Sequence, residues 1–193
     1  MSVTQKPRDD DLRAVHNITG VAGEYFVAAE LSRRGWIATL TLKNTPNIDL
    51  TATTPDGLRT VNIQVKTRSV KNRKGWVLTK KIETLVPGEN FYIAFVDLKG
   101  LEVRPDFYLI PRNLFSKWVA EQHSRWLATP GRSGRAHVDT SIRAFSEPQF
   151  KEFEKYHNNW ISSSLGAEIL VKNWGHTYVG TDPRGIVSTH ICA

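Results

Sequence analysis

The chain has 193 residues, of which 40% are hydrophobic and 23% charged, a composition typical of a globular protein with one domain and a real core. No apolar run approaches the roughly 20 residues that a membrane-spanning helix needs, and the polar start of the chain has the pattern of neither a signal nor a transit peptide. The one cysteine, Cys192, cannot form an internal disulfide or a zinc cluster, so we expect a reducing, cytoplasmic setting.

The net charge of +7 is concentrated in one segment. Between residues 66 and 81 there are seven basic residues and no acidic one, which favours a polyanionic partner, most commonly a phosphate backbone. The alternative is a solvated loop that only aids solubility. The basic residues of this segment are Lys66, Arg68, Lys71, Arg73, Lys74, Lys80 and Lys81.

The first half of the chain is predicted to form a helix followed by a hairpin. Residues 1–15 are polar and are predicted as a leader with the composition of a disordered segment. Residues 17–34 are predicted as a helix because apolar residues recur at helical spacing. Asp56-Gly57 is a strong hairpin signal between the last two of three predicted strands. These strands cover residues 36–42, 48–54 and 58–67.

The second half is predicted to extend the sheet and to add helices. Residues 91–97 form a continuous apolar run, which is typical of a buried central strand. A further strand is predicted at 106–110, and Pro111 opens a helix that runs to about residue 127. A last helix is predicted over 147–164, whereas residues 166–193 show no clear period. The apolar stripe of that helix consists of Phe150, Phe153, His157 and Trp160.

This order of elements predicts an α/β fold with a mixed β-sheet flanked by helices. We expect one domain at residues 16–165, with a core at 17–97 and an accessory strand and C-terminal helical additions at 98–165. Residues 166–193 are expected to be a C-terminal extension.

Three polar residues of the predicted hairpin are expected to share one face of the sheet. A two-residue turn at Asp56-Gly57 places Asp49 directly opposite Gln64, and directly opposed residues point to the same face. Because side chains alternate along a strand, Gln64 and Lys66 also share a face. A register shifted by two residues preserves this arrangement, whereas a shift by one residue destroys it. The prediction therefore depends on parity, that is, on whether any shift of the register is even or odd.

These residue types suit metal-assisted cleavage of a phosphodiester bond. Carboxylates are the usual ligands of Mg²⁺ or Mn²⁺, and a neighbouring lysine can position or deprotonate water or neutralise developing charge. We take Asp49 as the primary metal ligand, and the Gln64 side-chain oxygen and the Val65 carbonyl as weaker ligands. Glu24 is expected to approach the cation, through water, if the first helix packs over the hairpin.

Each of these residues alone has an ordinary structural explanation. A single aspartate is often a loop carboxylate, and a Gln-x-Lys pair is usually an exposed strand face. Glu24 can be a solvated acid that the helix dipole stabilises. Order, spacing and parity together favour a joint site. Glu30 is the rival acid, but it lies about 240° around the helix from Glu24, so the two cannot face the same site.

These residues resemble the PD-(D/E)XK nuclease superfamily. Its core runs helix, strand, strand, strand, helix, strand, with an acid-x-Lys motif on the third strand, and residues 17–97 cover that core. The Gln64-x-Lys66 motif is similar to that of Mrr-like restriction endonucleases, and the early Glu24 is similar to a glutamate of archaeal Holliday-junction resolvases. The chain departs from the pattern because Gln64 stands where most members carry an acid, and because residues 79–86 supply only two turns of helix.

The resemblance implies a restriction-endonuclease-like fold and a metal-dependent DNA endonuclease, a hydrolase acting in restriction, defence or repair. It implies Glu24, Asp49, Gln64 and Lys66 as the site, with Mg²⁺ as the cofactor and Mn²⁺ as a substitute. DNA is the expected partner, and cutting both strands favours a twofold homodimer. Two alternatives stay open: a binding module on the same scaffold that has lost catalysis, and a protein whose basic loop is incidental.

The basic segment is expected to hold the DNA backbone next to the site. Its tryptophan, Trp76, is a candidate for stacking on bases. The glycine-containing loop at residues 131–135 lacks the glycine-lysine signature of a nucleotide cradle and is expected to be a surface loop. The phosphate-binding candidates are Arg68, Lys71, Arg73, Lys74, Lys80 and Lys81.

Overall fold

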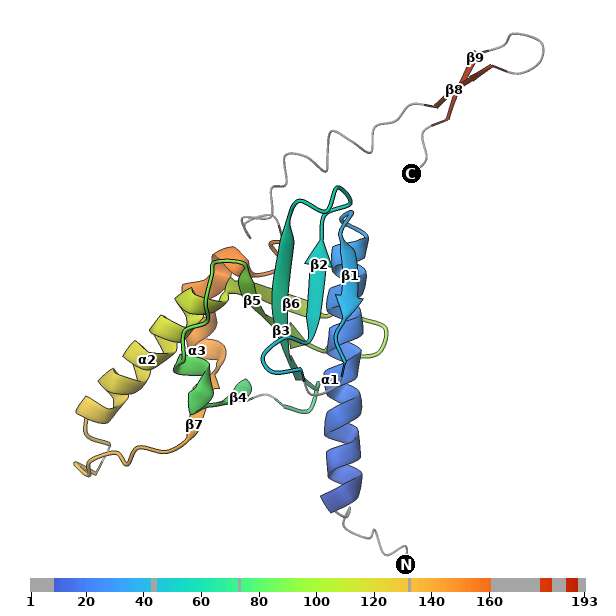
Figure 1. Ribbon diagram of the computed structural model, residues 1–193. Helices are drawn as coiled ribbons and strands as arrows, with labels where there is room; N and C mark the ends of the chain where they lie inside the picture. The colour runs from blue at the N-terminus through green and yellow to red at the C-terminus, as the bar shows by residue number, and fades with distance from the viewer. Residues whose placement is uncertain are drawn as a thin grey trace, which may run out of the picture.

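The computed structural model describes residues 9–42, 45–72, 74–131, 133–160, 178–181 and 187–190. Figure 1 shows a helix-flanked sheet built from these residues. Its helices and 3₁₀ turns are α1 (Asp9–Ser32), η1 (Lys80–Glu83), α2 (Arg112–Ala128), α3 (Glu147–Phe150) and η2 (Lys151–Tyr156). Its strands are β1 (Ile37–Leu40), β2 (Leu50–Thr53), β3 (Thr60–Arg68), β4 (Trp76–Thr79), β5 (Phe91–Asp97), β6 (Asp106–Pro111), β7 (Ile142–Phe145), β8 (Tyr178–Thr181) and β9 (Val187–His190).

The main sheet has five strands in the order β1-β2-β3-β5-β6. The β3–β5 pair is parallel and the other three pairs are antiparallel, so the sheet is mixed. A parallel pair requires a crossover connection, and here the crossover carries β4 and η1. Strand β4 pairs with β7 in a separate two-stranded ribbon. Strands β8 and β9 form a further antiparallel pair.

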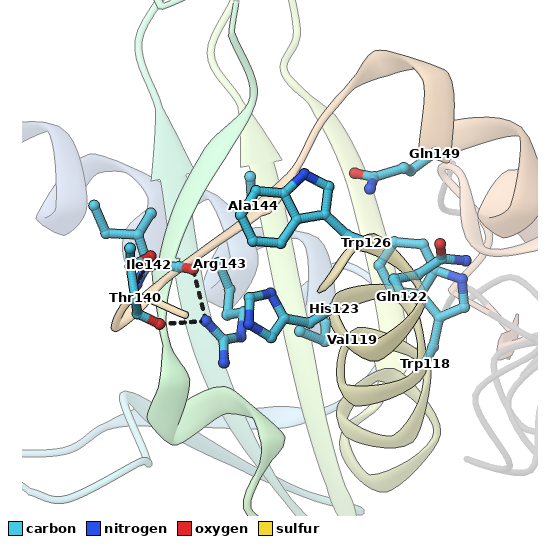
Figure 2. A pocket seen from close by; sticks show the side chains of 10 residues that line it. All are labelled: Trp118, Val119, Gln122, His123, Trp126, Thr140, Ile142, Arg143, Ala144 and Gln149. Atoms are coloured by element: carbon cyan, nitrogen blue, oxygen red, sulfur yellow. Dashed lines mark hydrogen bonds between the residues drawn. The ribbon is translucent and has the colours of Figure 1, made fainter. Parts of the chain in front are cut away.

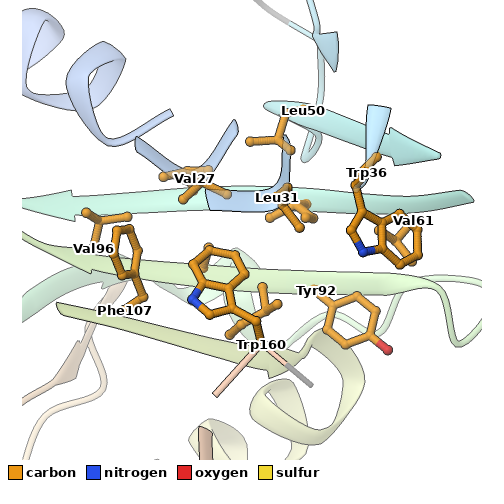
Figure 3. Close-up of a cluster of buried hydrophobic side chains, with 14 residues drawn as sticks. Val27, Leu31, Trp36, Leu50, Val61, Tyr92, Val96, Phe107 and Trp160 are labelled. Atoms are coloured by element: carbon orange, nitrogen blue, oxygen red, sulfur yellow. The ribbon is translucent and has the colours of Figure 1, made fainter. Parts of the chain in front are cut away.

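Helix α1 covers one face of the sheet. Val27 and Leu31 are buried there against the odd-numbered residues of β3, such as Ile63 and Val65, because alternate side chains of a strand share a face. Figure 3 shows this cluster, in which Trp160 and Phe107 complete the packing; their ring centroids lie 5.2 Å apart.

The close approach of α1 to the sheet depends on a glycine. A Cβ on Gly23 would lie 1.9 Å from Thr67 Oγ1 of β3, so no larger residue fits without displacement. Gly23 therefore sets α1 at the level of the C-terminal half of β3.

The opposite face is covered by α2, α3 and the β4–β7 ribbon, as Figure 1 shows. An aromatic core forms beneath them, where Phe95 of β5 contacts Trp76, Phe115 and Phe145 at centroid distances of 5.1, 4.9 and 4.8 Å. Gly75, with φ +98°, allows β7 to pack closely, because a Cβ there would lie 2.2 Å from the Phe145 carbonyl oxygen.

Among the helices of the described residues, none combines the length and the apolar composition that a membrane span requires.

The predicted mixed sheet with flanking helices is confirmed, including the strand at Phe91–Asp97 and the helix after Pro111. Four elements differ from the predictions. Helix α1 begins at Asp9, within the predicted polar leader. The expected helix at 147–164 begins at Glu147, but it changes to 3₁₀ geometry at Lys151 and ends at Tyr156, because Asn158 has φ 50° and pairs with Phe107 of β6 through bonds of 2.7 and 3.0 Å. Residues 161–164 of this prediction lie outside the described residues. Strands β4 and β7 were not predicted.

The predicted register of the β2–β3 hairpin is confirmed. Leu50 pairs with Ile63 and Thr53 with Thr60, as predicted, but the pairing stops at Leu50, and the Asp49 amide bonds to Ile63 so that Asp49 does not continue the register opposite Gln64. The turn itself is longer than predicted, since the hairpin closes with a bond of 2.9 Å from the Thr54 amide to the Arg59 carbonyl. Four residues lie between these two, and the Asp56 carboxylate accepts hydrogen bonds from Thr54 Oγ1 and the Leu58 amide. The observed four-residue loop gives the paired strands the same register as the predicted two-residue turn.

Candidate active site

Gln64 and Lys66 belong to the sheet face that looks away from α1, and Asp49 lies at the edge of β3 beside Val65. Their neighbours Ile63 and Val65 are buried in the cluster beneath α1, so the even positions of β3 point to the opposite side. Gln64 and Lys66 line one pocket on that side, and the Asp49 carboxylate accepts a hydrogen bond from Val65, the residue between them. The structure therefore brings three of the four predicted catalytic residues to one stretch of β3, where Gln64 and Lys66 share a face.

Asp49 lies where β2 separates from β3. Its amide donates to the Ile63 carbonyl at 2.9 Å, and its Oδ2 accepts a hydrogen bond of 2.6 Å from the Val65 amide. Strand β2 begins only at Leu50, so in the part of β3 beyond Ile63 this carboxylate takes the place of a strand neighbour. The half-buried Asp49 is thereby held at an open strand edge with its other oxygen, Oδ1, outside that bond.

The same edge presents a main-chain oxygen. In a strand, the N–H and C=O of one residue point to the same side. Because the Val65 amide points to Asp49, the Val65 carbonyl also points to the open edge. In contrast, the Asn62 amide and the Arg68 carbonyl make their hydrogen bonds on the β5 side of the strand. A carboxylate and a peptide oxygen thus meet at one place.

A pocket of about 250 Å³ adjoins Lys66. The Lys66 ammonium makes no hydrogen bond or ion pair to the residues that the structure describes, so it is available to a ligand in this pocket. The lining contains three basic side chains and no acidic one. The lining residues are Asn47, Gln64, Lys66, Val77, Leu78, Thr79, Lys81, Ile82 and Arg112.

Glu24 reaches the area from the other side of the sheet. It follows Gly23, which contacts Thr67 in the half of β3 that has lost its β2 neighbour. Glu24 is half-buried there, at the level of Lys66 but on the helix that covers the opposite face. Glu24 therefore lies on the opposite side of the sheet from Gln64 and Lys66. Its side chain could reach the site only around the open edge of β3.

The rival acid, Glu30, has a structural role. Its carboxylate is buried and pairs with Arg34 and, at 2.8 Å, with Arg104. Burial acts to raise the pKa of Glu30, but hydrogen bonds and charge from Arg104 and Arg34 outweigh it and lower the pKa below its usual value. Glu30 therefore joins α1 to the segment between β5 and β6 and is not part of the site.

Two members of the predicted nucleic-acid-binding set are internal, which corrects the sequence prediction. Arg68 is only 8% exposed, forms a 2.6 Å ion pair with Asp97 and lies 4.5 Å from the ring centroid of Trp76. Trp76 is 3% exposed because alternate residues of β4 point into the aromatic core. Neither side chain is presented to a phosphate or a base.

The remaining described members of this set are on the surface. Lys71, Lys74, Lys80 and Lys81 are exposed, whereas Arg73 lies outside the described residues. Lys80 pairs with Asp139 at 3.1 Å. Hydrogen bonds from His123 and Lys80 lower the pKa of Asp139 to about 2, so this carboxylate stays charged at neutral pH.

Six of the nine lining residues were not predicted from the sequence, among them Asn47 and Arg112. Asn47 has φ 61°, a left-handed conformation that asparagine tolerates, and the Pro46-Asn47 pair before Asp49 is the local signal for it. Arg112 is 4% exposed and donates to the Ile82 carbonyl at 2.7 Å. No sequence signal links Arg112 to β3, because packing of α2 on η1 brings it to the pocket.

The oxygen donors at the open edge match the preference of a hard divalent cation. They are the Asp49 carboxylate, the Gln64 amide oxygen and the Val65 carbonyl, whereas Glu24 lies on the helix that covers the opposite face of the sheet. Across the described residues, no group of three or more histidine, cysteine, aspartate or glutamate side chains is arranged to hold a metal. A cation here would therefore depend on neutral oxygens as well as on carboxylates.

Among the solved structures that this chain resembles are a homing endonuclease and a Holliday-junction resolvase. One is a bacterial homing endonuclease, with 15% identity, 75% of this chain and 89% of the other covered, and a TM-score of 0.43. The other is a Holliday-junction resolvase from the archaeal hyperthermophile Archaeoglobus fulgidus, with 18% identity, coverages of 69% and 88%, and a TM-score of 0.38. No family model and no curated protein matches the chain.

With TM-scores below 0.5, these matches add nothing to what the strand order shows. The described chain runs helix, strand, strand, strand and, after a crossover with a short 3₁₀ turn, a strand parallel to the third. The Gln-x-Lys pair lies on that third strand. This order of elements agrees with the restriction-endonuclease-like fold that the resemblance in sequence led us to expect.

Proposed function

We propose that this protein is a metal-dependent DNA endonuclease that hydrolyses phosphodiester bonds. The observation that carries the proposal is the hydrogen bond from the Val65 amide to the Asp49 carboxylate, which holds this acid beside the strand positions of Gln64 and Lys66. Gln64 and Lys66 line the same pocket, and the Val65 carbonyl is presented at the same strand edge.

Asp49, Gln64 and the Val65 carbonyl, with Glu24 in support, would hold Mg²⁺ or Mn²⁺. When bound, the cation supplies positive charge to the nonbridging phosphate oxygens and acidifies water. The bond from the Val65 amide to Asp49 Oδ2 holds the carboxylate in place, so it needs little reorganisation. Gln64 adds an amide that can orient water.

Lys66 is proposed to act on the scissile phosphate and on the attacking water. Its ammonium has no protein partner in the described structure, so its N–H donors are free for a phosphate oxygen or a water. A fixed cation beside the reacting phosphate favours the transition state, where the negative charge on the phosphate changes most. The lysine therefore contributes more to the chemical step than to binding.

The exposed lysines beyond β3 are proposed to bind the flanking DNA backbone. Lys71, Lys74 and Lys81 are surface charges near the site. Each phosphate contact releases counterions, so affinity should fall steeply as salt rises.

Replacement of Lys66 tests this proposal. Lys66→Ala should abolish Mg²⁺- or Mn²⁺-dependent cleavage while weakening DNA binding only slightly, since one phosphate contact of several is lost. Lys117→Ala, at an exposed lysine of α2 remote from the pocket lining, is the matched control and should cut at the wild-type rate. Wild-type cleavage rates in Lys66→Ala would end the assignment.

A second candidate function is a catalytically silent nucleic-acid-binding module on the same fold. Gln64 at the acid position and the absence of a cluster of three metal-ligating side chains in the described residues favour it. If it is correct, Mn²⁺ should not raise the melting temperature, and Gln64→Glu should create cation binding that the wild type lacks. A wild type that Mn²⁺ already stabilises excludes this module.

A cytoplasmic setting, a role in restriction, defence or repair, and a homodimer for cutting both strands are also part of the proposal. A twofold dimer would present two copies of the site to the two antiparallel strands. Sedimentation of the protein with and without duplex DNA measures the oligomeric state directly.

A further inference from the structure

The β4–β7 ribbon turns an unusual face to solvent. Its register pairs Val77 with Ala144 and Thr79 with Ile142, and all four residues are exposed. Val77 is 69% and Ile142 61% exposed. Two aliphatic side chains, a methyl group and a hydroxyl group therefore stand together on the outer face of a two-stranded ribbon.

The inner face holds this ribbon in one orientation. Trp76, Leu78 and Phe145 are buried in the aromatic core. Arg143 is 4% exposed, pairs with Glu83 of η1 and donates to the Thr140 and Ile142 carbonyls at 2.6 and 2.9 Å. The outward direction of Val77 and Ile142 thus follows from strand alternation on a fixed base.

The ribbon stands between two hollows. On the β4 side, Val77, Leu78 and Thr79 line the pocket that contains Lys66 and Lys81. On the β7 side lies a hollow of about 480 Å³ between β7 and α2, shown in Figure 2. Side chains that can donate hydrogen bonds line this second hollow, among them Gln122, His123, Thr140 and Gln149.

We propose that this ribbon enters the major groove of duplex DNA and reads base edges beside the scissile phosphate. This inference rests on the proposed nuclease function and names its substrate as a duplex. The major groove is about 12 Å wide and admits a two-stranded ribbon, whose strands lie about 5 Å apart. The phosphate backbone that borders the groove on the β4 side then lies at Lys66 and Lys81.

The chemistry of the outer face fits base edges. Val77, Ala144 and Ile142 are suited to apolar contact with thymine methyl groups, and the Thr79 hydroxyl can donate to or accept from a base edge. The charges at the ribbon fit the bordering backbones, since Lys74, Lys80 and Lys81 are exposed and the nearby acid, Asp139, is already paired with Lys80. Phosphate contacts position the duplex, whereas this face carries sequence information.

The test measures duplex binding by the full chain in EDTA, where cleavage is blocked. Wild-type protein is used to select duplexes from a randomised library, and the dissociation constant is then measured for selected and for random duplexes at several salt concentrations. The ribbon variant is Val77→Ala with Ile142→Ala. Its matched control is Leu58→Ala with Leu101→Ala, because these leucines are 83% and 102% exposed and lie outside the ribbon.

The wild type should prefer selected duplexes, and the ribbon variant should lose roughly tenfold of that preference while the slope of affinity against salt is unchanged. The control should keep the preference. Lys81→Ala should instead reduce the salt slope by about one and leave the preference in place. Thermal denaturation should show all variants folded, since every replaced side chain is exposed.

Duplex binding without any sequence preference, or a preference that the ribbon variant retains, would overturn the ribbon inference and leave the nuclease proposal standing. Tighter binding of single strands that is lost in Trp126→Ala would also overturn it, since Trp126 is a 43% exposed aromatic ring in the second hollow. Failure to bind any DNA at low salt would contradict the proposed function itself.

Discussion

Asp49 shows how one residue serves both the fold and the proposed chemistry. Its Oδ2 accepts the Val65 amide and so satisfies a strand edge, while its second oxygen remains outside that bond. The shared face of Gln64 and Lys66 could be predicted because a strand alternates strictly, and the β2–β3 register could be predicted because the turn signal set it. The hydrogen bond to Val65 could not, because it depends on where β2 leaves the sheet.

Arg68 marks the limit of charge patterns at the scale of single residues. The same run of basic residues contains a buried arginine and exposed lysines, and composition alone cannot separate them. Arg68 is buried because β5 supplies its ion-pair partner, Asp97, and because the crossover between β3 and β5 supplies Trp76, whose ring lies against the Arg68 guanidinium. Both partners lie outside the short stretch of sequence around Arg68.

We predict that Arg68→Ala lowers the free energy of unfolding by about 3 kcal/mol, since it leaves the buried Asp97 with Lys99 alone. Lys74→Ala, at an exposed position, should change it by less than about 0.5 kcal/mol. Urea denaturation measures both. A stable Arg68→Ala that has lost DNA affinity would restore Arg68 to the phosphate-binding set.

At the scale of elements, local patterns predicted β5 and α2 well, because a continuous apolar run and a proline-initiated helix are local signals. Strands β4 and β7 were missed because each has four residues and its partner lies far away in the chain. The end of the last helix was misplaced because Asn158 bonds to β6, a tertiary contact that overrides helix propensity.

The contact of α1 with β3 gives a prediction at this scale. Gly23→Ala should destabilise the protein by about 1–3 kcal/mol, because its Cβ would meet Thr67 Oγ1 at 1.9 Å. Gly20→Ala on the same helix is the matched control. Nothing lies within 4 Å of its Cβ, so it should be neutral or stabilising by up to about 1 kcal/mol. Equal melting temperatures for the two variants would show that α1 does not pack as described.

At the scale of the whole molecule, buried ion pairs join elements that are distant in sequence. Asp97 connects β5 to β3 through Arg68, and Lys99 connects Asp97 to Asp106 of β6. Burial acts to raise the pKa of Asp97, but hydrogen bonds from Arg68 and Lys99 outweigh it and the pKa is lowered. The pKa of Asp106 is lowered in the same way, with Asn158 and Lys99 as donors that outweigh burial.

These shifts predict acid lability. A carboxyl group whose pKa is lower in the folded state contributes stability that is fully present above its unfolded pKa of about 4 and is lost as the pH falls through the folded value. The free energy of unfolding should therefore be level above about pH 5 and fall below about pH 4. Asp97→Asn should be less stable at pH 7 and should show a shallower acid decline. Identical pH profiles for the two proteins would contradict this network.

The measurement that tests the central claim most directly is nicking of supercoiled plasmid by wild type and Asp49→Asn in Mg²⁺ or Mn²⁺, with duplex binding and melting temperature measured on the same samples. The asparagine oxygen can still accept the Val65 amide, so stability and binding should be close to wild type while metal-dependent cutting is lost. Asp49→Asn that cuts as fast as wild type would contradict the proposed site.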